Sequence, residues 1–185
     1  MRKLLTLATL AMMICVFATS CGKDEDKDTW SQYEKYRKAN IAFFDEQQTL
    51  TDADGKPFYT KLAPDWNRTA EILIHYFNDR SETAGNLVPM LTSTCAVKYR
   101  GQLYNGAVFD STSNALNQTV NMTVGKAITG VQIALMDMHV GDSARVVIPY
   151  NLGYGGVTTY TGIPPYSTLV FDIKLTDIPY YEIRP

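Results

Sequence analysis

A phenol held between two glycines is the arrangement in this chain best suited to chemistry. Tyr154 stands between Gly153 and Gly155, in a loop that follows Pro149 and the alternating, half-buried strand pattern of residues 144–148. Glycine permits backbone conformations that other residues avoid, so this loop can hold the Tyr154 side chain over a cavity. The chemistry that this permits is hydrogen bonding by a hydroxyl at the rim of the cavity.

Residues suited to other chemistries are few and scattered. His75 and His139 are the only histidines, and neither has a cysteine or second histidine at ligand spacing. Residues 52–55 (Asp-Ala-Asp-Gly) lack the later acidic ligands of a calcium loop. No histidine-paired nucleophile or glycine-rich phosphate loop occurs. The sequence therefore predicts no metal and no cofactor.

The composition is typical of a globular protein, and the chain has no excess of positive charge. Of the 185 residues, 45% are hydrophobic and 19% are charged, which is enough to build a sizeable core. The formal net charge is -2, so nothing attracts a phosphate backbone and nucleic acid is not an expected partner.

Residues 1–20 have the pattern of a lipoprotein signal peptide. A positive start (Arg2, Lys3) precedes an apolar run at 4–17 that is short for a membrane span, and small residues at 18–20 precede Cys21. The pattern resembles a bacterial, Bacteroidetes-like lipoprotein signal. It implies export and lipidation of Cys21, which would anchor the chain in the cell envelope, at the outer membrane on its periplasmic or surface face. The alternative is an ordinary secretory signal with an incidental cysteine.

The other cysteines fit this interpretation. Cys15 falls inside the signal, which leaves Cys95 alone in the mature chain, so no intramolecular disulfide is expected. Cys95 alternates with Val97 in a strand pattern and is predicted to be a small buried hydrophobe. Residues 21–29 are a run of charges that predicts a solvated tether; it also resembles a surface-export stretch.

The mature chain predicts one helix, then strands around a second helix. Residues 30–48 are helical with an aromatic stripe, which either packs on the following domain, forms a dimer seam or binds a client. Asn105-Gly106 is a strong hairpin signal. Residues 131–138 have the spacing of one buried helix face, and Gly141 can end that helix. Strand patterns occur at 58–62, 70–77, 94–99, 107–109, 120–124, 144–148 and 168–175.

A series of ordered motifs resembles a known family. They are Tyr99-x-Gly101, Gly106-x-x-Phe109-Asp110-Ser111, Gly125-x-x-Ile128-x-Gly130, Met138-x-Val140-Gly141, Tyr154-Gly155 and Ile163-Pro164-Pro165-x-x-x-Leu169-x-Phe171. Together they resemble an FKBP-type peptidyl-prolyl cis-trans isomerase domain over about residues 87–178. The resemblance implies an α+β fold in which an antiparallel β-sheet wraps around a short α-helix, with an extra N-terminal helical segment. The predicted divisions are a signal at 1–20, a tether at 21–29, an extension at 30–86 and an FKBP-like domain at 87–185.

The resemblance also implies roles for individual residues. It makes aromatic walls of Tyr99, Phe109 and Phe171, a wall and backbone N–H donor of Ile128, a hydroxyl donor of Tyr154 and a polar edge of Asp110. The implied substrate-binding residues are Val120, Ala127, Val131 and Ile163. Taken singly, the aromatic residues could be ordinary core and Asp110 a turn residue. The implied ligands are proline-containing polypeptides and macrolide inhibitors, with no cofactor.

Two departures from the family pattern affect the expected function. Val131 stands where the family usually has a tryptophan floor, and Val120 where it has a phenylalanine. Losing two aromatic side chains removes apolar wall area, so the expected pocket is weaker. The leading hypothesis is an isomerase or folding factor of weak activity that acts on exported proteins. The alternatives are an FKBP-like binding or chaperone module with little activity, and an interaction protein built on the N-terminal helix.

Overall fold

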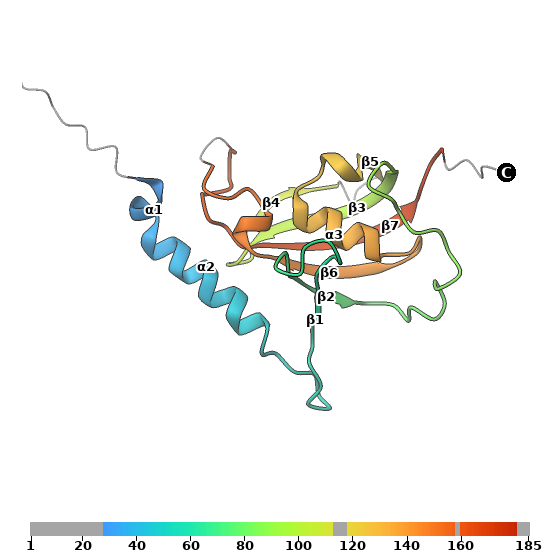
Figure 1. Cartoon of the computed structure of the whole chain (residues 1–185), viewed down its shortest axis with the longest axis horizontal. Coiled ribbons are helices and arrows are strands. Elements are labelled where there is room, and N and C mark those ends of the chain that lie inside the picture. The colour runs from blue at the N-terminus through green and yellow to red at the C-terminus, as the bar shows by residue number, and fades with distance from the viewer. Residues whose placement is uncertain (1–27, 113–117, 158–159, 181–185) are drawn as a thin grey trace, which may run out of the picture.

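The computed structural model describes residues 28–112, 118–157 and 160–180 (Figure 1). Over these residues, seven strands form one antiparallel sheet in the order β1-β2-β6-β7-β3-β4, with β5 paired to β3. The strands are β1 (Thr60–Leu62), β2 (Ile72–Tyr76), β3 (Thr94–Leu103), β4 (Val108–Ser111), β5 (Val120–Thr123), β6 (Ser143–Ile148) and β7 (Leu169–Asp177). The helices are α1 (Thr29–Gln32), α2 (Glu34–Gln47) and α3 (Thr129–Asp137), with 3-10 turns η2 (Val124–Lys126) and η3 (Tyr150–Leu152).

Helix α3 packs on the inner face of the sheet, as predicted. Its buried residues share one core with the even-numbered apolar residues of β2 and β6. A Cβ atom at Gly130 would lie 2.3 Å from Cγ2 of Ile148, so only glycine lets the helix approach the sheet this closely. The α+β arrangement of an antiparallel sheet around a short helix is confirmed.

The Asn105-Gly106 hairpin is also present. Gly106 has φ +83°, and the Leu103 amide donates to the Ala107 carbonyl at 2.9 Å. Strand β3 runs four residues beyond the predicted end at Tyr99, because backbone pairing with β7 continues through Gly101 to Leu103. Glycine interrupts the apolar alternation there, which conceals the second half of the strand in the sequence.

Helix α2 covers part of the outer face of the sheet. Phe43 and Phe44 pack against a second cluster formed by Tyr59, Leu73 and Val147. Val147 is fully buried, so the end of β6 is covered on both faces and not on one as its alternation predicted. The predicted helix is split at Tyr33 into α1 and α2. Ile41 of α2 is 36% exposed.

The N-terminal extension shares the sheet of the C-terminal residues. Strand β2 pairs with β6, so the predicted boundary between residues 86 and 87 divides one continuous sheet. Buried Asp142 joins the two parts, because its carboxylate accepts hydrogen bonds from Thr83 at 2.5 Å and Asn78 at 3.0 Å. Helix α3 ends at Asp137, before Gly141, whose φ of +102° serves the following turn and not the helix end.

Several predictions concern residues outside the described ranges. The signal at 1–20, Cys21 and most of the tether lie there. None of the helices among the described residues combines the length and apolar character needed to cross a membrane.

Candidate functional site

A cavity of about 350 Å³ opens between the sheet, the start of α3 and the loop after η3. We call it the aromatic cavity. Its lining residues come from four strands, the η2–α3 segment and the Tyr/Gly loop: Tyr99, Phe109, Asp110, Met122, Lys126, Ala127, Ile128, Val131, Tyr154, Tyr160 and Phe171. Segments far apart in the sequence therefore converge on one apolar depression.

Three aromatic rings form the walls on the sheet side. The Phe171 ring lies edge-on to Phe109, with 5.6 Å between ring centroids, and 6.1 Å from the Tyr99 ring. The backbone of Gly101 passes directly beneath them. A Cβ atom at Gly101 would lie 2.6 Å from Cζ of Phe109 and 2.9 Å from Cε1 of Phe171. Glycine at position 101 is therefore a steric requirement of this aromatic arrangement.

Two phenols and one carboxylate provide polar groups at the rim. The Tyr99 hydroxyl donates to Oδ2 of exposed Asp110 at 2.6 Å. Burial, followed by this hydrogen bond and the charge of Asp110, raises the pKa of Tyr99 well above its usual range. Burial first, then Tyr160 and the Asp110 charge, raise the pKa of Tyr154. Both phenols therefore stay neutral at physiological pH, and Tyr154 keeps a proton to donate.

The start of α3 provides a backbone wall. Ile128 is the N-cap residue, and its carbonyl accepts hydrogen bonds from the amides of Val131 at 2.9 Å and Gln132 at 3.1 Å. Amides at a helix N-terminus have no acceptor within the helix. Within the described residues no hydrogen bond engages the Ile128 N–H, and Ile128 lines the cavity, so this N–H can donate to a carbonyl oxygen bound there.

The floor of the cavity lies next to a small void. Val131 is 4% exposed and lines both the aromatic cavity and a small apolar space of about 10 Å³ next to it. The void is lined by Val97, Tyr99, Met122, Val131, Leu135, Phe171 and Ile173. A space this small and apolar offers too few polar partners to hold a water molecule. Part of the volume that a larger side chain at 131 would fill is therefore unfilled.

The structure brings together most of the residues named from the sequence. The six residues given catalytic roles all line the cavity, as do Ala127 and Val131. Val120 does not line it and is 39% exposed at the start of β5. Ile163 is not among the lining residues either and packs in the core.

Sequence reasoning missed three lining residues, which are Met122, Lys126 and Tyr160. For Met122, the strand alternation in the sequence contained the needed information. Met122 shares the strand face of Val120, so the face was identified but the position on it was two residues off. The place where β5 crosses the cavity depends on its pairing with β3, which places Met122 opposite Cys95.

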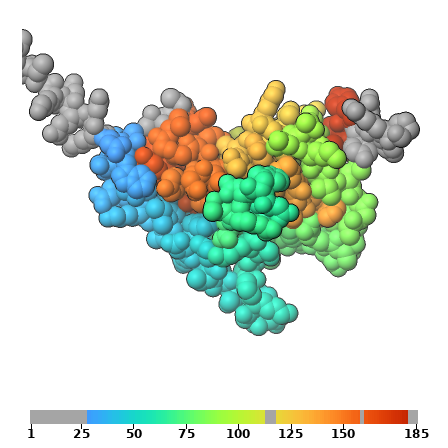
Figure 2. All heavy atoms as spheres, in the orientation of Figure 1, coloured from blue at the N-terminus to red at the C-terminus, as the bar shows by residue number. Residues whose placement is uncertain are grey.

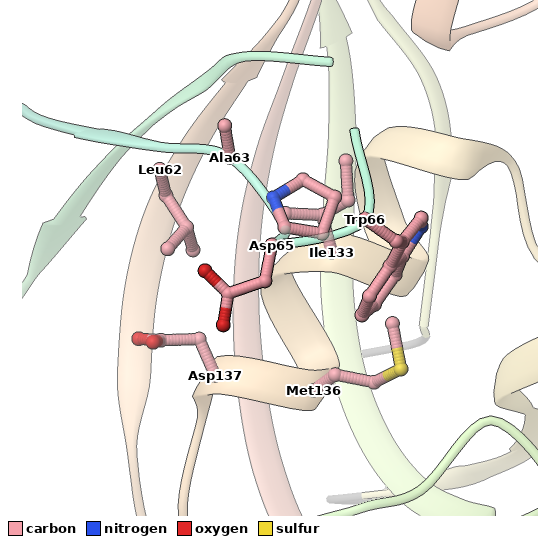
Figure 3. A pocket seen from close by; sticks show the side chains of 8 residues that line it. Leu62, Ala63, Asp65, Trp66, Ile133, Met136 and Asp137 are labelled. Atoms are coloured by element: carbon pink, nitrogen blue, oxygen red, sulfur yellow. The ribbon is translucent and has the colours of Figure 1, made fainter. Parts of the chain in front are cut away.

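A second depression, of about 340 Å³, lies on another side of α3 (Figure 3). We call it the Trp66 groove; it is lined by residues 62–66 and by Ile133, Met136 and Asp137. Trp66 is 73% exposed, and Asp137 is already bound by the Tyr76 hydroxyl at 2.5 Å and by Arg80 at 3.1 Å. Both carboxylates that line this groove are therefore occupied, because Asp65 pairs with Arg68.

The described residues contain no group of three or more histidine, cysteine or acidic side chains that could hold a metal ion. His75 stacks on Phe58, with 4.0 Å between ring centroids, and His139 lies beside Arg80, so both are away from the aromatic cavity. Burial raises the pKa of Cys95 to about 11, which leaves its thiol protonated and unreactive.

The fold is shared with a solved isomerase structure. A peptidyl-prolyl cis-trans isomerase from Pseudomonas syringae is 27% identical, with a TM-score of 0.63 over 79% of this chain and 95% of that chain. Residues 86–176 match the FKBP-type peptidyl-prolyl cis-trans isomerase family. The structural likeness extends beyond the matched residues into the N-terminal extension.

Curated relatives match a similar length of this chain. FK506-binding protein 4 of Chaetomium thermophilum is 45% identical over 83 residues, which are 45% of this chain and 17% of the relative. An FKBP-type 22 kDa peptidyl-prolyl cis-trans isomerase of Escherichia coli is 40% identical over 91 residues, 49% of this chain and 44% of the relative. The matched region thus spans less than half the length of either relative.

Proposed function

We propose that this protein accelerates cis-trans isomerisation of X-Pro peptide bonds. The observation that supports this most directly is the convergence of Tyr99, Phe109 and Phe171 with Tyr154 and Ile128 around one cavity. The family of the domain has this activity by name, and the cavity offers apolar walls with two hydrogen-bond donors at its edge.

The geometry is suited to this reaction because the barrier is one of amide resonance. Twisting a peptide bond costs about 20 kcal/mol and makes the amide less polar than in either planar state. A dry aromatic cavity binds the prolyl ring and the twisted amide. The Tyr154 hydroxyl and the Ile128 N–H donate to the rotated carbonyl oxygen. The cavity then binds the transition state more strongly than the planar states, which lowers the barrier without a nucleophile or cofactor.

Exchange spectroscopy on a short X-Pro peptide tests the proposal. We expect the purified chain to increase the cis-trans exchange rate in proportion to its concentration. Circular dichroism shows whether the chain in the assay is folded. No increase with folded protein at high concentration would contradict the isomerase function.

A binding module with little isomerase activity is the second candidate, favoured by the void next to Val131. A floor that leaves space under the prolyl ring makes fewer contacts, so binding and catalysis weaken together. Peptide binding in a titration without faster X-Pro exchange would support this second function over the first.

We further propose that the protein is a lipid-anchored folding factor that acts on exported polypeptides. The support is the signal pattern of residues 1–20 with Cys21 after it. Radiolabelled palmitate should enter the wild-type chain in a bacterial host and be absent from Cys21→Ala. Label that persists in this variant would rule out Cys21 as the lipid site, whatever the isomerase assay shows.

A further inference from the structure

The N-terminal helices contact the loop that continues from Tyr154. Helices α1 and α2 lie outside residues 86–176, yet they pack against residues 166–168. Figure 2 shows the blue surface of these helices directly beside the orange surface of this part of the chain. Two polar contacts and one ring contact join α1 and α2 to the loop, in addition to a buried asparagine.

Asn40 of α2 is the buried asparagine and the most specific of these contacts. Its side chain is fully buried, and its Oδ1 accepts a hydrogen bond from the Thr168 amide at 2.7 Å. The Asn40 carbonyl also accepts one from the Thr168 hydroxyl at 3.0 Å. Asparagine is a poor residue for the middle of a helix, because its side chain competes for backbone groups. Its place here is explained by the loop that it binds.

Tyr36 and α1 extend the contact along the loop. The Tyr36 hydroxyl lies 2.9 Å from Oγ of Ser167, which itself donates to the Pro164 carbonyl at 2.6 Å. The Thr29 hydroxyl lies 3.0 Å from the Tyr166 hydroxyl. The Trp30 ring meets the Tyr166 ring edge-on, with 5.4 Å between centroids. Three consecutive loop residues, 166 to 168, are therefore each held by the N-terminal helices.

Tyr166 contacts both α1 and the residues that directly follow Tyr154. Its φ is +63°, a conformation that costs free energy for an aromatic residue and persists only where the surroundings fix it. The Tyr166 amide donates to the Gly155 carbonyl at 2.7 Å. A Cβ atom at Gly156 would lie 2.8 Å from the Tyr166 hydroxyl, so the ring rests on that glycine. Gly155 directly follows Tyr154, the proposed donor.

We infer that α1 and α2 position the loop at the mouth of the aromatic cavity, and through it the Tyr154 hydroxyl. Asn40, Tyr36 and Tyr166 are positioning residues, because none of them lines the cavity. The inference rests on the proposed isomerase function. It assigns the N-terminal helices a part in catalysis, beyond their packing on the sheet. Misplacement of a positioned group by about 1 Å can lower a rate about 100-fold, and loss of an interaction made only in the transition state lowers kcat and leaves KM largely unchanged.

Two variants and a matched control test this inference in the full-length chain. Tyr36→Phe keeps the ring and removes only the hydroxyl that faces Ser167. Asn40→Ala removes the acceptor of the Thr168 amide. Lys38→Ala is the control, because Lys38 is exposed on the other side of α2 and pairs only with Glu34 among the contacts seen. We expect kcat to fall about threefold in Tyr36→Phe and about tenfold in Asn40→Ala, with KM within about twofold.

Amide NMR spectra supply a readout that does not depend on turnover. The resonances of Tyr154, Gly155 and Gly156 should shift in Tyr36→Phe, and those of Ile133 in α3 should not. Lys38→Ala should leave both sets in place. If the wild type does not isomerise X-Pro bonds, the proposed function fails, and the amide shifts still decide whether the helices position the loop. An active wild type with unchanged kcat and unshifted Tyr154–Gly156 resonances in the folded Tyr36→Phe variant would overturn the inference.

Discussion

Two depressions of similar volume flank α3, and they differ in what encloses them. The aromatic cavity has a volume of about 350 Å³ and the Trp66 groove about 340 Å³. At 100° per residue, Val131 faces the cavity while Met136 faces the groove from another side of the helix. Volume therefore does not identify the site.

The difference lies in the groups that form the walls. In the aromatic cavity, rings from β3, β4 and β7 contact one another, and within the described residues no hydrogen bond engages the Tyr154 hydroxyl or the Ile128 N–H. In the Trp66 groove, Asp65 is paired with Arg68, Asp137 with Arg80, and the indole is mostly in solvent. A ligand site combines apolar and aromatic walls with a few placed polar groups, and in the aromatic cavity these are three contacting rings with the Tyr154 hydroxyl and the Ile128 N–H.

Substitution of Gly101 should break the aromatic cavity most severely. Gly101→Ala places a methyl group 2.6 Å from Phe109 and 2.9 Å from Phe171, so both rings must move. Displacement of cavity walls by about 1 Å costs on the order of 100-fold in rate, which we expect in kcat/KM. The matched control is Gly85→Ala, because a Cβ atom there meets nothing within 4 Å. Near wild-type activity of folded Gly101→Ala would refute the assignment of these walls.

Loss of the Tyr154 hydroxyl should have the next largest effect. Tyr154→Phe keeps the ring beside Tyr160, 4.4 Å between centroids, and removes one donor to the transition state. We expect kcat to fall roughly tenfold, the worth of a strong hydrogen bond. Tyr180→Phe serves as control, since Tyr180 is 86% exposed. Equal rates for the two variants would mean that Tyr154 is only a wall.

These two positions also show how far the sequence alone could go. Tyr154 between glycines and the wall residues of β3, β4 and β7 could be named because local patterns and family order fix their places. Val120 was misplaced because the register of β5 on β3 decides which residue of one strand face reaches the cavity. Tyr160 was missed because it reaches Tyr154 through a loop, and loops carry no periodicity.

The outer face of the sheet was the least predictable part of the fold. Val147 alternates with Val146 and Ile148 as a residue facing solvent would, yet Phe43 and Phe44 of α2 cover it. Packing between segments 100 residues apart leaves no signal in either local pattern. The polar contacts from Asn40 to Thr168 were unpredictable for the same reason.

A larger side chain at position 131 should increase the affinity of the aromatic cavity for a ligand, and so increase its difference from the Trp66 groove. Val131→Trp adds apolar surface over the empty space of about 10 Å³ and narrows the cavity above it. We expect affinity for a macrolide ligand, measured by calorimetry, to rise roughly fivefold. Val120→Phe restores the other aromatic residue, but Val120 lies outside the cavity and affinity should not change. A larger gain from Val120→Phe would contradict the placement of β5.

Activity in the aromatic cavity should be flat with pH across the neutral range. Burial raises the pKa values of Tyr99 and Tyr154, so both phenols remain protonated and Tyr154 remains a donor. We expect constant kcat/KM from about pH 6 to about pH 9. Because folding raises these pKa values, the associated stability is present below about pH 10 and is lost as pH rises through the folded values. A rate that falls between about pH 7 and 9 would implicate another titrating group.

The smallest effect should come from the Trp66 groove. Trp66→Ala removes the largest side chain of the groove, but the indole is 73% exposed and contributes little to the core. We expect stability within about 0.5 kcal/mol of wild type and kcat/KM on a short X-Pro peptide within about twofold. A second assay, the refolding rate of an unfolded protein substrate, distinguishes the role of the groove from the role of the aromatic cavity. If Trp66→Ala slows refolding of that substrate while peptide isomerisation is unchanged, the groove binds polypeptide outside the reacting bond. If both are unchanged, turnover depends on the aromatic cavity alone, because that depression combines contacting aromatic walls with the Tyr154 hydroxyl and the Ile128 N–H.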